Sequence, residues 1–591
     1  MCAIREDHFR VAIIGGGPRG LAALESLCSA LTDSALAARM QVILFEASTY
    51  RGSGPNYAPD QFSGSLLNLP ERELDIPPRA DMRIARQVVA GFPSYKKWAD
   101  ADHAEGGNQR VDRYPARARL GHYLQSRFNS MALPLESAGW LTIVESEVLQ
   151  VRWDATVECH VIEHAAGAVA RVDEVVLAIG HQPTAPGKDM RAWMQHADQH
   201  PDCRLVTEPY PLESHMRDES IAPGCTVALR GFGLSMIDVV KGLTEGRGGR
   251  FVVADDDRRT MIYEPSGREP GRIAPFSLDG LPMAPKPLNR HLDDCFRPGS
   301  LQEQFFEKQC SILAEHGEGK RACRQLINLI SHIQVAVFLR VRPDVVDHYS
   351  PSRLFDIAVS WLRDEDYRHE LIVDRDLPAE HGMQLFIDMA CGLEPPGFDY
   401  CLGQVWRHLQ KIMFRAFSHS SLSVEAISDL VELHERMKRY TYGPPVDNAQ
   451  CLLALLRSRH LTFAFVDDPE TRLVEEGWEL VKGADRMLAT VMIDTVLSSP
   501  ILSKVGTPLI RQLLDEARLI PLSESLGAST REGSVAVQGE ALSASPPVAL
   551  LGRLATGSIL GADSITESFG HEQREWAGQL IKRVLESRCP D

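Results

Sequence analysis

Three closely spaced glycines between an apolar strand and a helix constrain the fold of this chain more than any other feature. Gly15, Gly17 and Gly20 follow an apolar run at residues 9–14, which predicts a buried parallel strand, and they open a predicted helix that begins at Pro18. Gly15 permits a tight turn, Gly17 lets the backbone approach a pyrophosphate, and Gly20 lets the helix pack closely on the strand. The amino end of such a helix attracts phosphate. We therefore expect a dinucleotide here, with Pro18 beside the glycines at the same site.

A carboxylate completes this first site. Residues 41–45 predict a second strand, which makes the segment a βαβ unit, and Glu46 ends that strand. A carboxylate at this place accepts hydrogen bonds from both ribose hydroxyls and repels a 2′-phosphate. The site therefore predicts FAD. The alternative, a glycine-rich turn that binds no ligand, does not account for the strand, the helix and the acid together.

A second, weaker copy of the pattern begins at Thr226. The predicted strand there leads into Gly231 and Gly233 and then into a helix with Ser235 in its first turn, but Met236 replaces the third glycine. We expect a second βαβ unit that binds a nucleotide. A strand, turn and helix without a nucleotide is the competing interpretation.

A basic segment, YEPSGREPGR at residues 263–272, follows the next two predicted strands. Its residues Ser266, Arg268 and Arg272 are suited to hold the 2′-phosphate of NADPH by charge-assisted hydrogen bonds. Solvated arginines are the alternative. One acidic and one basic ribose site would fit one FAD and one NADPH.

Two further strand ends carry small residues. Gly180 lies in the turn that closes the predicted strand of VVLAIGHQP, between the two nucleotide units. Near the end of the chain, LGRLATGS contains Gly552, Thr556 and Gly557, whose backbone amides could face the flavin ring and its ribityl chain. The alternative for both is an ordinary strand followed by a turn.

The order of these units predicts an α/β fold with two Rossmann-like dinucleotide-binding domains, one for FAD and one for NADPH, and a helical insertion. Apolar residues at three- and four-residue spacing mark the helical part, and strands alternate again after it. The expected domains are an amino-terminal FAD part at 1–220, an NADPH domain at 221–300, the insertion at 301–457, and a return to the nucleotide-binding core at 458–591 that completes the FAD domain.

Composition narrows the partners. The formal net charge of −17 and a pI near 5.7 disfavour nucleic acid and anionic membrane surfaces, and favour a small-molecule ligand. The twelve cysteines show no CxxC, no zinc-like pairing and no CxxxxC, so we expect no metal and no thiol relay. The amino-terminal residues lack an apolar signal stretch, and we expect no membrane helix and a cytoplasmic protein. Formation of a homo-oligomer stays open.

Several segments in this order resemble the bacterial FAD/NAD(P)-binding family related to class B flavin monooxygenases, above all its amine N-hydroxylating branch. The similar segments are residues 53–75, YPARARLGHYL at 114–124, 263–282 and LLGRLATGS near the end, and the resemblance spans most of the chain. In size and organisation the sequence looks like the nitrosuccinate-forming aspartate N-monooxygenases. The resemblance implies that Asn68 and Asp75 lie near the isoalloxazine ring and that Arg117 approaches the FAD phosphates or the ring face. Their alternative role is loop architecture.

The resemblance also implies an activity. NADPH would reduce the flavin, the reduced flavin would capture dioxygen as a C4a-hydroperoxide, and a small-molecule amine, such as that of aspartate, would take up the distal oxygen. No FxGxxxHxxxWP or FxGxxxHxxxY signature lies between the two glycine patterns, which disfavours oxygen insertion next to a ketone. Because the cofactors carry this chemistry, no catalytic acid or base is assigned, and none of the twenty histidines receives a role.

Two other functions fit the same residues. One is a flavin oxidoreductase that passes electrons to an acceptor without inserting oxygen. The other is a non-catalytic flavin-binding redox sensor whose second glycine pattern is empty and whose helical insertion is an interaction surface. Reduction of the flavin by NADPH, and a hydroxylated product under air, would separate the three.

Overall fold

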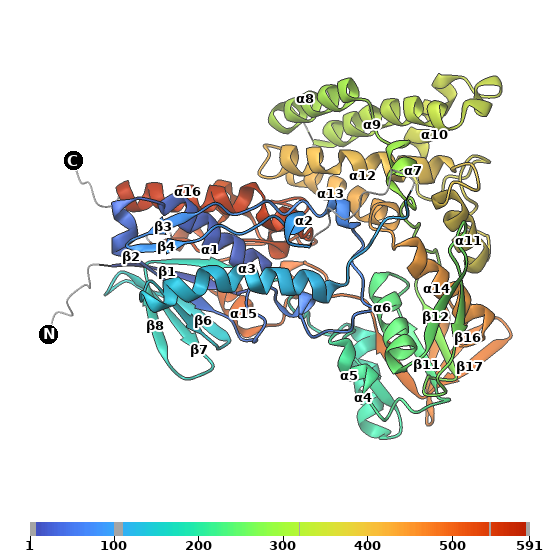
Figure 1. Cartoon of the computed structure of the whole chain (residues 1–591), viewed down its shortest axis with the longest axis horizontal. Helices are drawn as coiled ribbons and strands as arrows, with labels where there is room; N and C mark the ends of the chain where they lie inside the picture. Colours follow the sequence, from blue (N-terminus) through green and yellow to red (C-terminus); the bar gives the residue numbers. More distant parts are fainter. Residues whose placement is uncertain (1–7, 100–109, 318, 543–544, 587–591) are drawn as a thin grey trace.

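The computed structural model describes residues 8–99, 110–317, 319–542 and 545–586. Figure 1 shows three groups of elements: a sheet with its helices on the left, a smaller sheet at the lower right, and a layer of helices at the upper right. The blue and red parts of the chain lie together on the left, where helix α1 (Pro18–Leu31) contacts helix α16 (His571–Glu586). Sequence-distant segments therefore build one unit.

The first unit is a seven-stranded sheet with the order β19-β20-β21-β9-β1-β2-β5. Its strands β5, β2, β1, β9 and β21 pair in parallel, while β20 and β19 are added antiparallel. The bounds are β1 (Phe9–Ile14), β2 (Met40–Phe45), β5 (Leu141–Val144), β9 (Glu174–Leu177), β19 (Thr530–Arg531), β20 (Val535–Ala536) and β21 (Ala549–Leu550). The parallel strands read as continuous apolar runs because helices cover them on both faces.

Smaller elements surround this sheet. A hairpin, β3-β4, lies in the chain between the long loop of residues 50–79 and helix α3, and a three-stranded antiparallel sheet, β6-β7-β8, follows α3. Arg79 attaches the end of that loop to α1, because its guanidinium donates a hydrogen bond to the buried Glu25 of α1. Glu25 also accepts two hydrogen bonds from Arg127. The bounds are β3 (Met82–Ile84), β4 (Gln87–Val89), α2 (Tyr95–Trp98), α3 (Arg117–Ser137), β6 (Val148–Asp154), β7 (Cys159–His164), β8 (Val169–Val172) and α15 (Pro508–Asp515).

The second unit is a four-stranded parallel sheet with the order β10-β18-β11-β14. The predicted strands at 250–255 and 260–264 do not join it; they form a separate antiparallel hairpin.

Residues 470–494, expected to complete the first domain, instead supply β18 and a three-stranded meander to the second. The bounds are α4 (Lys188–Gln199), β10 (Arg204–Val206), α5 (Leu212–Met216), β11 (Thr226–Arg230), α6 (Leu234–Leu243), β12 (Arg250–Asp255), β13 (Thr260–Glu264), β14 (Arg272–Phe276), β15 (Glu470–Val474), β16 (Gly477–Lys482), β17 (Asp485–Ala489) and β18 (Val491–Asp494). The predicted α/β class with two Rossmann-type sheets is confirmed.

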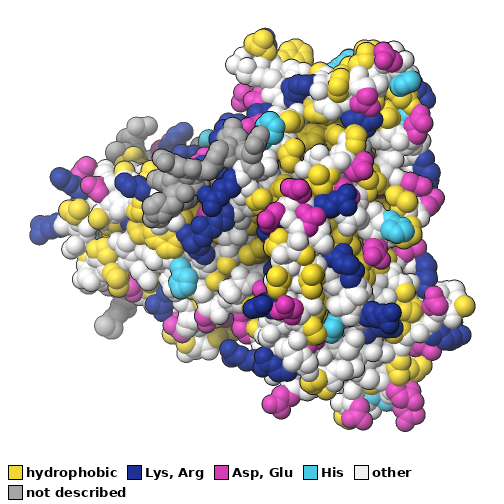
Figure 2. All heavy atoms as spheres, turned by 45° about the vertical axis from the view of Figure 1, so that its right-hand side comes forward, with side chains coloured by type: hydrophobic (Ala, Val, Ile, Leu, Met, Phe, Trp, Pro, Cys, Tyr) yellow, Lys and Arg dark blue, Asp and Glu magenta, His cyan; other side chains and the backbone are white. Residues whose placement is uncertain are grey.

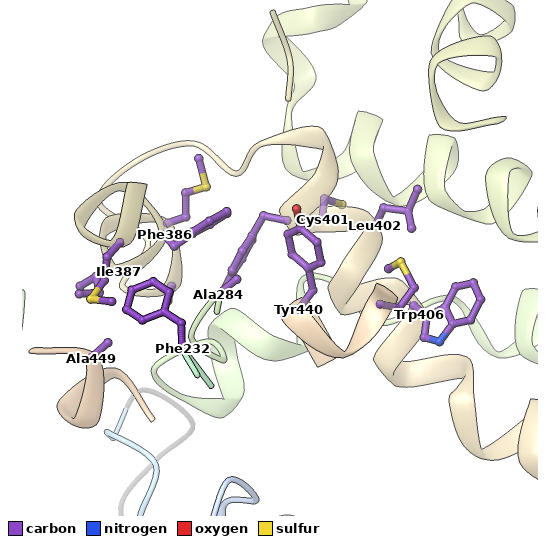
Figure 3. Packing of buried hydrophobic residues seen from close by; sticks show 14 of the residues in the cluster. Phe232, Ala284, Phe386, Ile387, Cys401, Leu402, Trp406, Tyr440 and Ala449 are labelled. Carbon is purple, nitrogen blue, oxygen red and sulfur yellow. The ribbon is translucent and has the colours of Figure 1, made fainter. Parts of the chain in front are cut away.

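The helical layer shares its core with the second sheet. In Figure 3, Phe232 from the turn after β11 points toward Phe386 and Ile387 of the helical layer, with Tyr440 nearby. The bounds are α7 (Arg290–Asp294), α8 (Ser300–His316), α9 (Gly319–Val341), α10 (Pro351–Arg363), α11 (Ala379–Ala390), α12 (Phe398–Phe417), α13 (Val424–Thr441) and α14 (Val446–Arg457). One continuous apolar cluster thus joins the second sheet and the helical layer.

One helix corrects an expectation about apolar segments. Among the described residues, the part of α9 at Arg321–Val341 is long and apolar enough to cross a membrane by length and composition, with a mean hydropathy of 1.3. Of that window, 56% is buried, and α9 contacts α10, α12 and α13, as a core helix does. On the face shown in Figure 2, basic and acidic side chains are interspersed.

Candidate active site

The first glycine pattern borders a cavity of about 520 Å³ at the carboxyl edge of the seven-stranded sheet. Five of the residues predicted to hold FAD line it: Gly15, Gly17, Pro18, Glu46 and Gly180. They come from the ends of β1, β2 and β9, which are neighbours in the sheet. Parallel strands end at the same edge, which is why residues far apart in sequence meet here.

The geometry of the turn fits a nucleotide. A Cβ on Gly20 would overlap with the carbonyl oxygen of Gly15, so the helix approaches the turn as closely as glycine alone allows. Gly15 has a φ of +101°, in the region that favours glycine. The first turn of α1 has no side-chain cap, which leaves its backbone N–H groups available to phosphate. Gly20 therefore shapes the site without lining it.

Glu46 lies at the end of β2, as predicted. Its Oε2 accepts a hydrogen bond of 2.6 Å from the backbone N–H of Gly16, and its Oε1 accepts bonds from the backbone and hydroxyl of Ser48. These bonds fix the carboxylate at the wall of the cavity. An ionised carboxylate accepts about four hydrogen bonds, so an acceptor position remains for a ribose hydroxyl.

The carboxy-terminal turn is arranged differently from the prediction. Gly552, Thr556 and Gly557 do not line the cavity; Gly552 packs against Arg19, and the Thr556 hydroxyl bonds the carbonyl of Arg553. Arg553, which lies between Gly552 and Thr556, is the residue of this turn whose side chain lines the cavity. The sequence prediction missed this arginine, together with Arg19, Tyr57, His181 and residues 562–565.

A second cavity, of about 570 Å³, adjoins the first. The two share part of their lining: Tyr57, His181, Arg553, Asp563, Ser564 and Ile565. The second cavity also receives Asn68 and Asp75, predicted near the flavin ring, and Leu234 from the amino end of α6. The first sheet, the second sheet and the helical layer therefore meet at this cavity.

Charge in the second cavity is predominantly positive. Eight cationic and four carboxylate side chains line it: Arg72, Lys96, Lys286, Arg297, Arg407, Lys411, Lys438 and Arg553 against Glu73, Asp75, Asp563 and Glu567. Burial and the nearby Arg553 lower the pKa of His181 to about 4, so this imidazole is neutral at pH 7. A site lined in this way attracts an anionic ligand.

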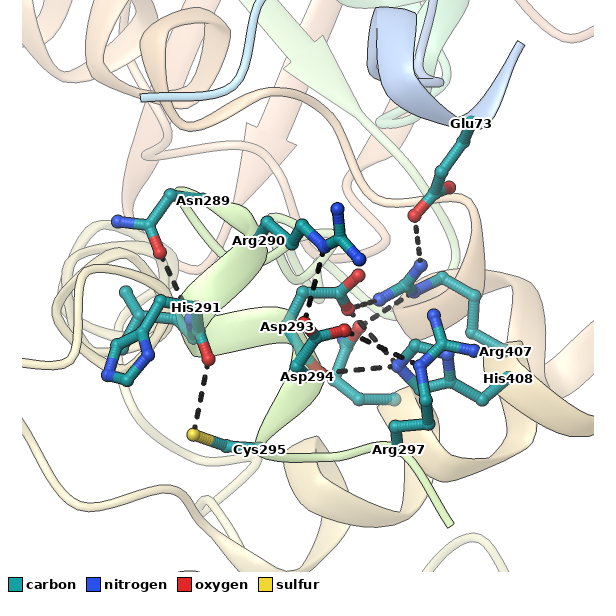
Figure 4. A network of polar contacts seen from close by, with 12 residues as sticks. Glu73, Asn289, Arg290, His291, Asp293, Asp294, Cys295, Arg297, Arg407 and His408 are labelled. Carbon is teal, nitrogen blue, oxygen red and sulfur yellow. Dashed lines mark hydrogen bonds and ion pairs between the residues drawn. The ribbon is translucent and has the colours of Figure 1, made fainter. Parts of the chain in front are cut away.

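A buried network of charges forms one wall of the second cavity. Figure 4 shows Glu73, from the loop of the first unit, pointing at Arg407 of α12, whose guanidinium also pairs with Asp293 of α7. Arg72 completes the network through Asp293 at 2.9 Å and Glu73 at 3.1 Å. Burial alone would raise the pKa values of both carboxyls, but the two arginines outweigh it and hold both below their usual range. The carboxylates are thus committed to arginines.

Arg117 does not line either cavity. Its Nη2 lies 3.0 Å from Oδ2 of Asp238 on α6, and the Tyr210 hydroxyl donates to the same oxygen at 2.7 Å. Burial lowers the pKa of Arg117, but Asp238 and Tyr210 outweigh it and leave the pKa above its usual value. Contrary to the prediction, this arginine joins the two nucleotide-binding folds, because α3 begins at their boundary.

The second glycine pattern forms the expected strand, turn and helix. Gly231 has a φ of +120°, and a Cβ there would overlap with the hydroxyl of Thr495 at the end of β18. Gly233 caps α6 without a side-chain hydrogen bond, and Ser235 is buried in the first turn. Met236 is 1% exposed and packs in the large apolar cluster, which explains why no glycine is needed there.

The basic segment lies at the wrong edge of the second sheet to serve this turn. Arg272 pairs with Thr226, the first residue of β11, whereas Gly231 follows the last residue of that strand. Ser266 donates to the carbonyl of Arg247, beyond the far end of α6, and Arg268 lies beside Gly248. A segment that leads into a parallel strand must lie at the amino edge, opposite the nucleotide turn. The structure therefore does not bring these three residues to the glycine turn.

Within the described part of the chain, no cluster of three or more histidine, cysteine, aspartate or glutamate side chains could hold a metal ion. None of the ten described cysteines forms a disulfide bond with another of them.

Known proteins share parts of this arrangement. Residues 12–182 match the model of a family described as FAD-NAD(P)-binding. The chain is 33% identical over 278 residues to nitrosuccinic acid synthase of Aspergillus oryzae, a match that covers 46% of this chain and 41% of that protein. It is 28% identical over 299 residues to a nitrosuccinate-forming L-aspartate N-monooxygenase of Streptomyces davaonensis, covering 46% and 44%. L-Lysine 6-monooxygenase from Pseudomonas syringae aligns with a TM-score of 0.47 and 12% identity over 98% of this chain and 100% of that one.

The chain spans less than half the length of the curated relatives it matches. Two of these relatives are nitrosuccinate-forming enzymes, which confirms the resemblance predicted from the sequence. Residues 12–182 are thus similar to the FAD-NAD(P)-binding family, and the chain is similar to nitrosuccinate-forming aspartate N-monooxygenases.

Proposed function

We propose that this protein is an FAD- and NADPH-dependent monooxygenase that hydroxylates the amine of a small amino acid such as aspartate. The observation that carries the proposal is the junction of two cavities: the one at the first glycine pattern continues into a cationic one where both nucleotide folds and the helical layer meet. The similarity to aspartate N-monooxygenases supports the reaction type.

The first cavity would hold FAD. Gly15, Gly17 and Pro18 would receive the pyrophosphate at the amino end of α1, and Glu46 would bind the ribose. The shared residues His181 and Arg553 lie on the side that opens toward the second cavity, where the flavin ring would reach. The glycine cradle fits this assignment, since a side chain at Gly20 has no room.

The second fold would hold NADPH. Gly231 and Gly233 form a turn with the required shape, and Leu234 directly after them lines the second cavity, which fits a nicotinamide that reaches the flavin. FAD reduced by NADPH supplies the activation of dioxygen. The contribution of the chain is to orient the amine, to exclude water and to neutralise an anionic substrate with the cations of the second cavity.

The test is an anaerobic titration of the yellow protein with NADPH and with NADH, followed by turnover under air with L-aspartate. We expect NADPH to bleach the flavin and aspartate to yield a hydroxylated or further oxidised nitrogen product. Bleaching without such a product would support an electron-transferring oxidoreductase, and a flavin that neither nucleotide bleaches would support a redox sensor. Either result would contradict the proposal.

A further inference from the structure

A buried lysine in the second cavity has no carboxylate partner. Lys286 is 3% exposed and lies between β14 and α7, and its side chain lines the cavity. Its ammonium donates to the backbone carbonyl oxygen of Asn68. Among the described residues, no carboxylate lies within 4.0 Å of its nitrogen, and this carbonyl is its one hydrogen-bond acceptor. An ammonium has three donors, so two are left for a ligand.

The carboxylates nearby are committed elsewhere. Glu73 pairs through Oε1 with both Arg407 and Arg72, and Asp293 pairs through Oδ1 with Arg407 and through Oδ2 with Arg72. Burial, together with Arg407 and Arg72, lowers the pKa of Lys286 to about 7, although Glu73 and Asp293 act in the opposite direction. A buried ammonium without a counter-ion is unfavourable, and a ligand carboxylate would relieve that cost.

The backbone around Lys286 is held on both sides, so the ammonium has a defined place. The carbonyl of Pro285 accepts from the buried Tyr400 hydroxyl at 3.0 Å, and the N–H of Ala284 donates to the carbonyl of Arg439 at 3.0 Å. The backbone N–H of Lys286 donates to Pro444. Two other cations of the cavity wall do have carboxylate partners: Arg407 bonds two carboxylates and an amide, and Lys438 pairs with Asp563 and Glu435.

We propose that Lys286 binds a carboxylate of the substrate and positions its amine in the second cavity. The inference rests on the proposed function for the reaction, and it adds the residue that selects an anionic amino acid as the substrate. The Asn68 carbonyl that accepts from Lys286 belongs to the loop at residues 67–75 of the first fold, so the ammonium is fixed relative to that fold.

The test compares a dicarboxylate with its neutral counterpart. Succinate and succinamide are titrated into the oxidised FAD-loaded protein by calorimetry, with Lys286→Met and, as a control, Lys308→Met, an exposed lysine of α8 that lines neither cavity. We expect the wild type to bind succinate at least about tenfold more tightly than succinamide, Lys286→Met to lose most of that ratio, and Lys308→Met to keep most of it. A preference that survives in Lys286→Met, or a wild type without a preference, would overturn the inference.

A second measurement does not depend on a variant that folds. Binding of succinate to the wild type at pH 8 should take up a proton, because the ligand favours the charged form of Lys286; calorimetry in buffers of different ionisation enthalpy measures this. Binding without proton uptake would contradict the inference. Reduction of the flavin by NADPH is followed in the same preparations. Failure of that step with an intact succinate preference would refute the proposed reaction and leave Lys286 as an anion site.

Discussion

Arg117 of the first nucleotide-binding fold and Asp238 of the second form an ion pair across the boundary between the folds, with 3.0 Å between Nη2 and Oδ2. Tyr210 donates to the same carboxylate oxygen, and the ring of Tyr210 lies 5.5 Å from the guanidinium carbon. Arg117 is the first residue of α3, and Asp238 lies in the middle of α6. It therefore fixes the first fold relative to the second.

Replacing Asp238 with asparagine should destabilise the protein. The side chain of Asp238 is 3% exposed, so the change leaves the Arg117 guanidinium largely buried without a counter-ion. We expect the free energy of unfolding to fall by roughly 3 kcal/mol. Urea denaturation measures it. Asp256→Asn is the control, because that carboxylate is 93% exposed in its pair with Arg259 and its loss should be close to neutral. Equal effects of the two variants would show that the pair across the boundary has no special weight.

Replacing Gly17 with alanine should remove FAD and keep the fold. Gly17 has a φ of −72°, and a Cβ there would meet Gly54 at an ordinary distance of 3.6 Å, so the protein itself accepts the methyl group. The pyrophosphate would not, since it must approach this backbone closely. We expect FAD binding to weaken about tenfold or more, or about 1.4 kcal/mol. The ratio of released flavin to protein measures this.

The control for that variant is Gly187→Ala, at the start of α4. This glycine has a φ of −66° and open space at its Cβ position. Its flavin content should match that of the wild type. A Gly17→Ala protein with full flavin content would contradict the placement of the pyrophosphate.

The sequence allowed the first site to be predicted because its parts are local or lie at strand ends. Gly15, Gly17 and Glu46 belong to one βαβ unit, and Gly180 ends the strand next to β1. Pairing in parallel brings all of them to one edge, whatever the length of chain between them. Fold class and this edge therefore followed from pattern alone.

The second site could not be placed in the same way. The strands after α6 form a hairpin of their own, so that Arg272 begins the next parallel strand at the opposite edge. No local pattern distinguishes a strand that joins the sheet from one that leaves it. Lys286 and Arg407 were missed because their cavity is assembled from segments that are distant in sequence and carry no shared motif.

Arg230 should contribute to the binding of NADPH, whereas Arg272 should not. Arg230 ends β11 directly before the glycine turn, its side chain is 42% exposed, and it pairs with Asp494 at 3.0 Å. We expect Arg230→Ala to raise the KM for NADPH about fivefold or more, because charge at this edge can reach a bound phosphate. Arg272→Ala and Arg268→Ala should change it less than about twofold, since both lie at the amino edge. Steady-state kinetics decides; a large effect of Arg272→Ala alone would reverse the assignment of edges.

Lys286 should make stability depend on pH in a window that its substitution removes. Its pKa is lowered from 10.5 to about 7 in the folded protein, first by burial and then by Arg407. Between these two pH values the unfolded chain holds a proton that the folded protein has lost, so the contribution of this residue to the free energy of unfolding rises with pH. Below pH 7 the buried ammonium is destabilising. Lys286→Met should therefore melt at a higher temperature than the wild type at pH 6, and the difference should shrink as the pH approaches 10.

Because Glu73, Asp293 and Arg72 are present in both proteins, comparing the two proteins isolates the effect of the lysine. A difference that stays constant from pH 6 to pH 10 would mean that Lys286 is not titrating, and that its ammonium already has a partner in the unliganded protein.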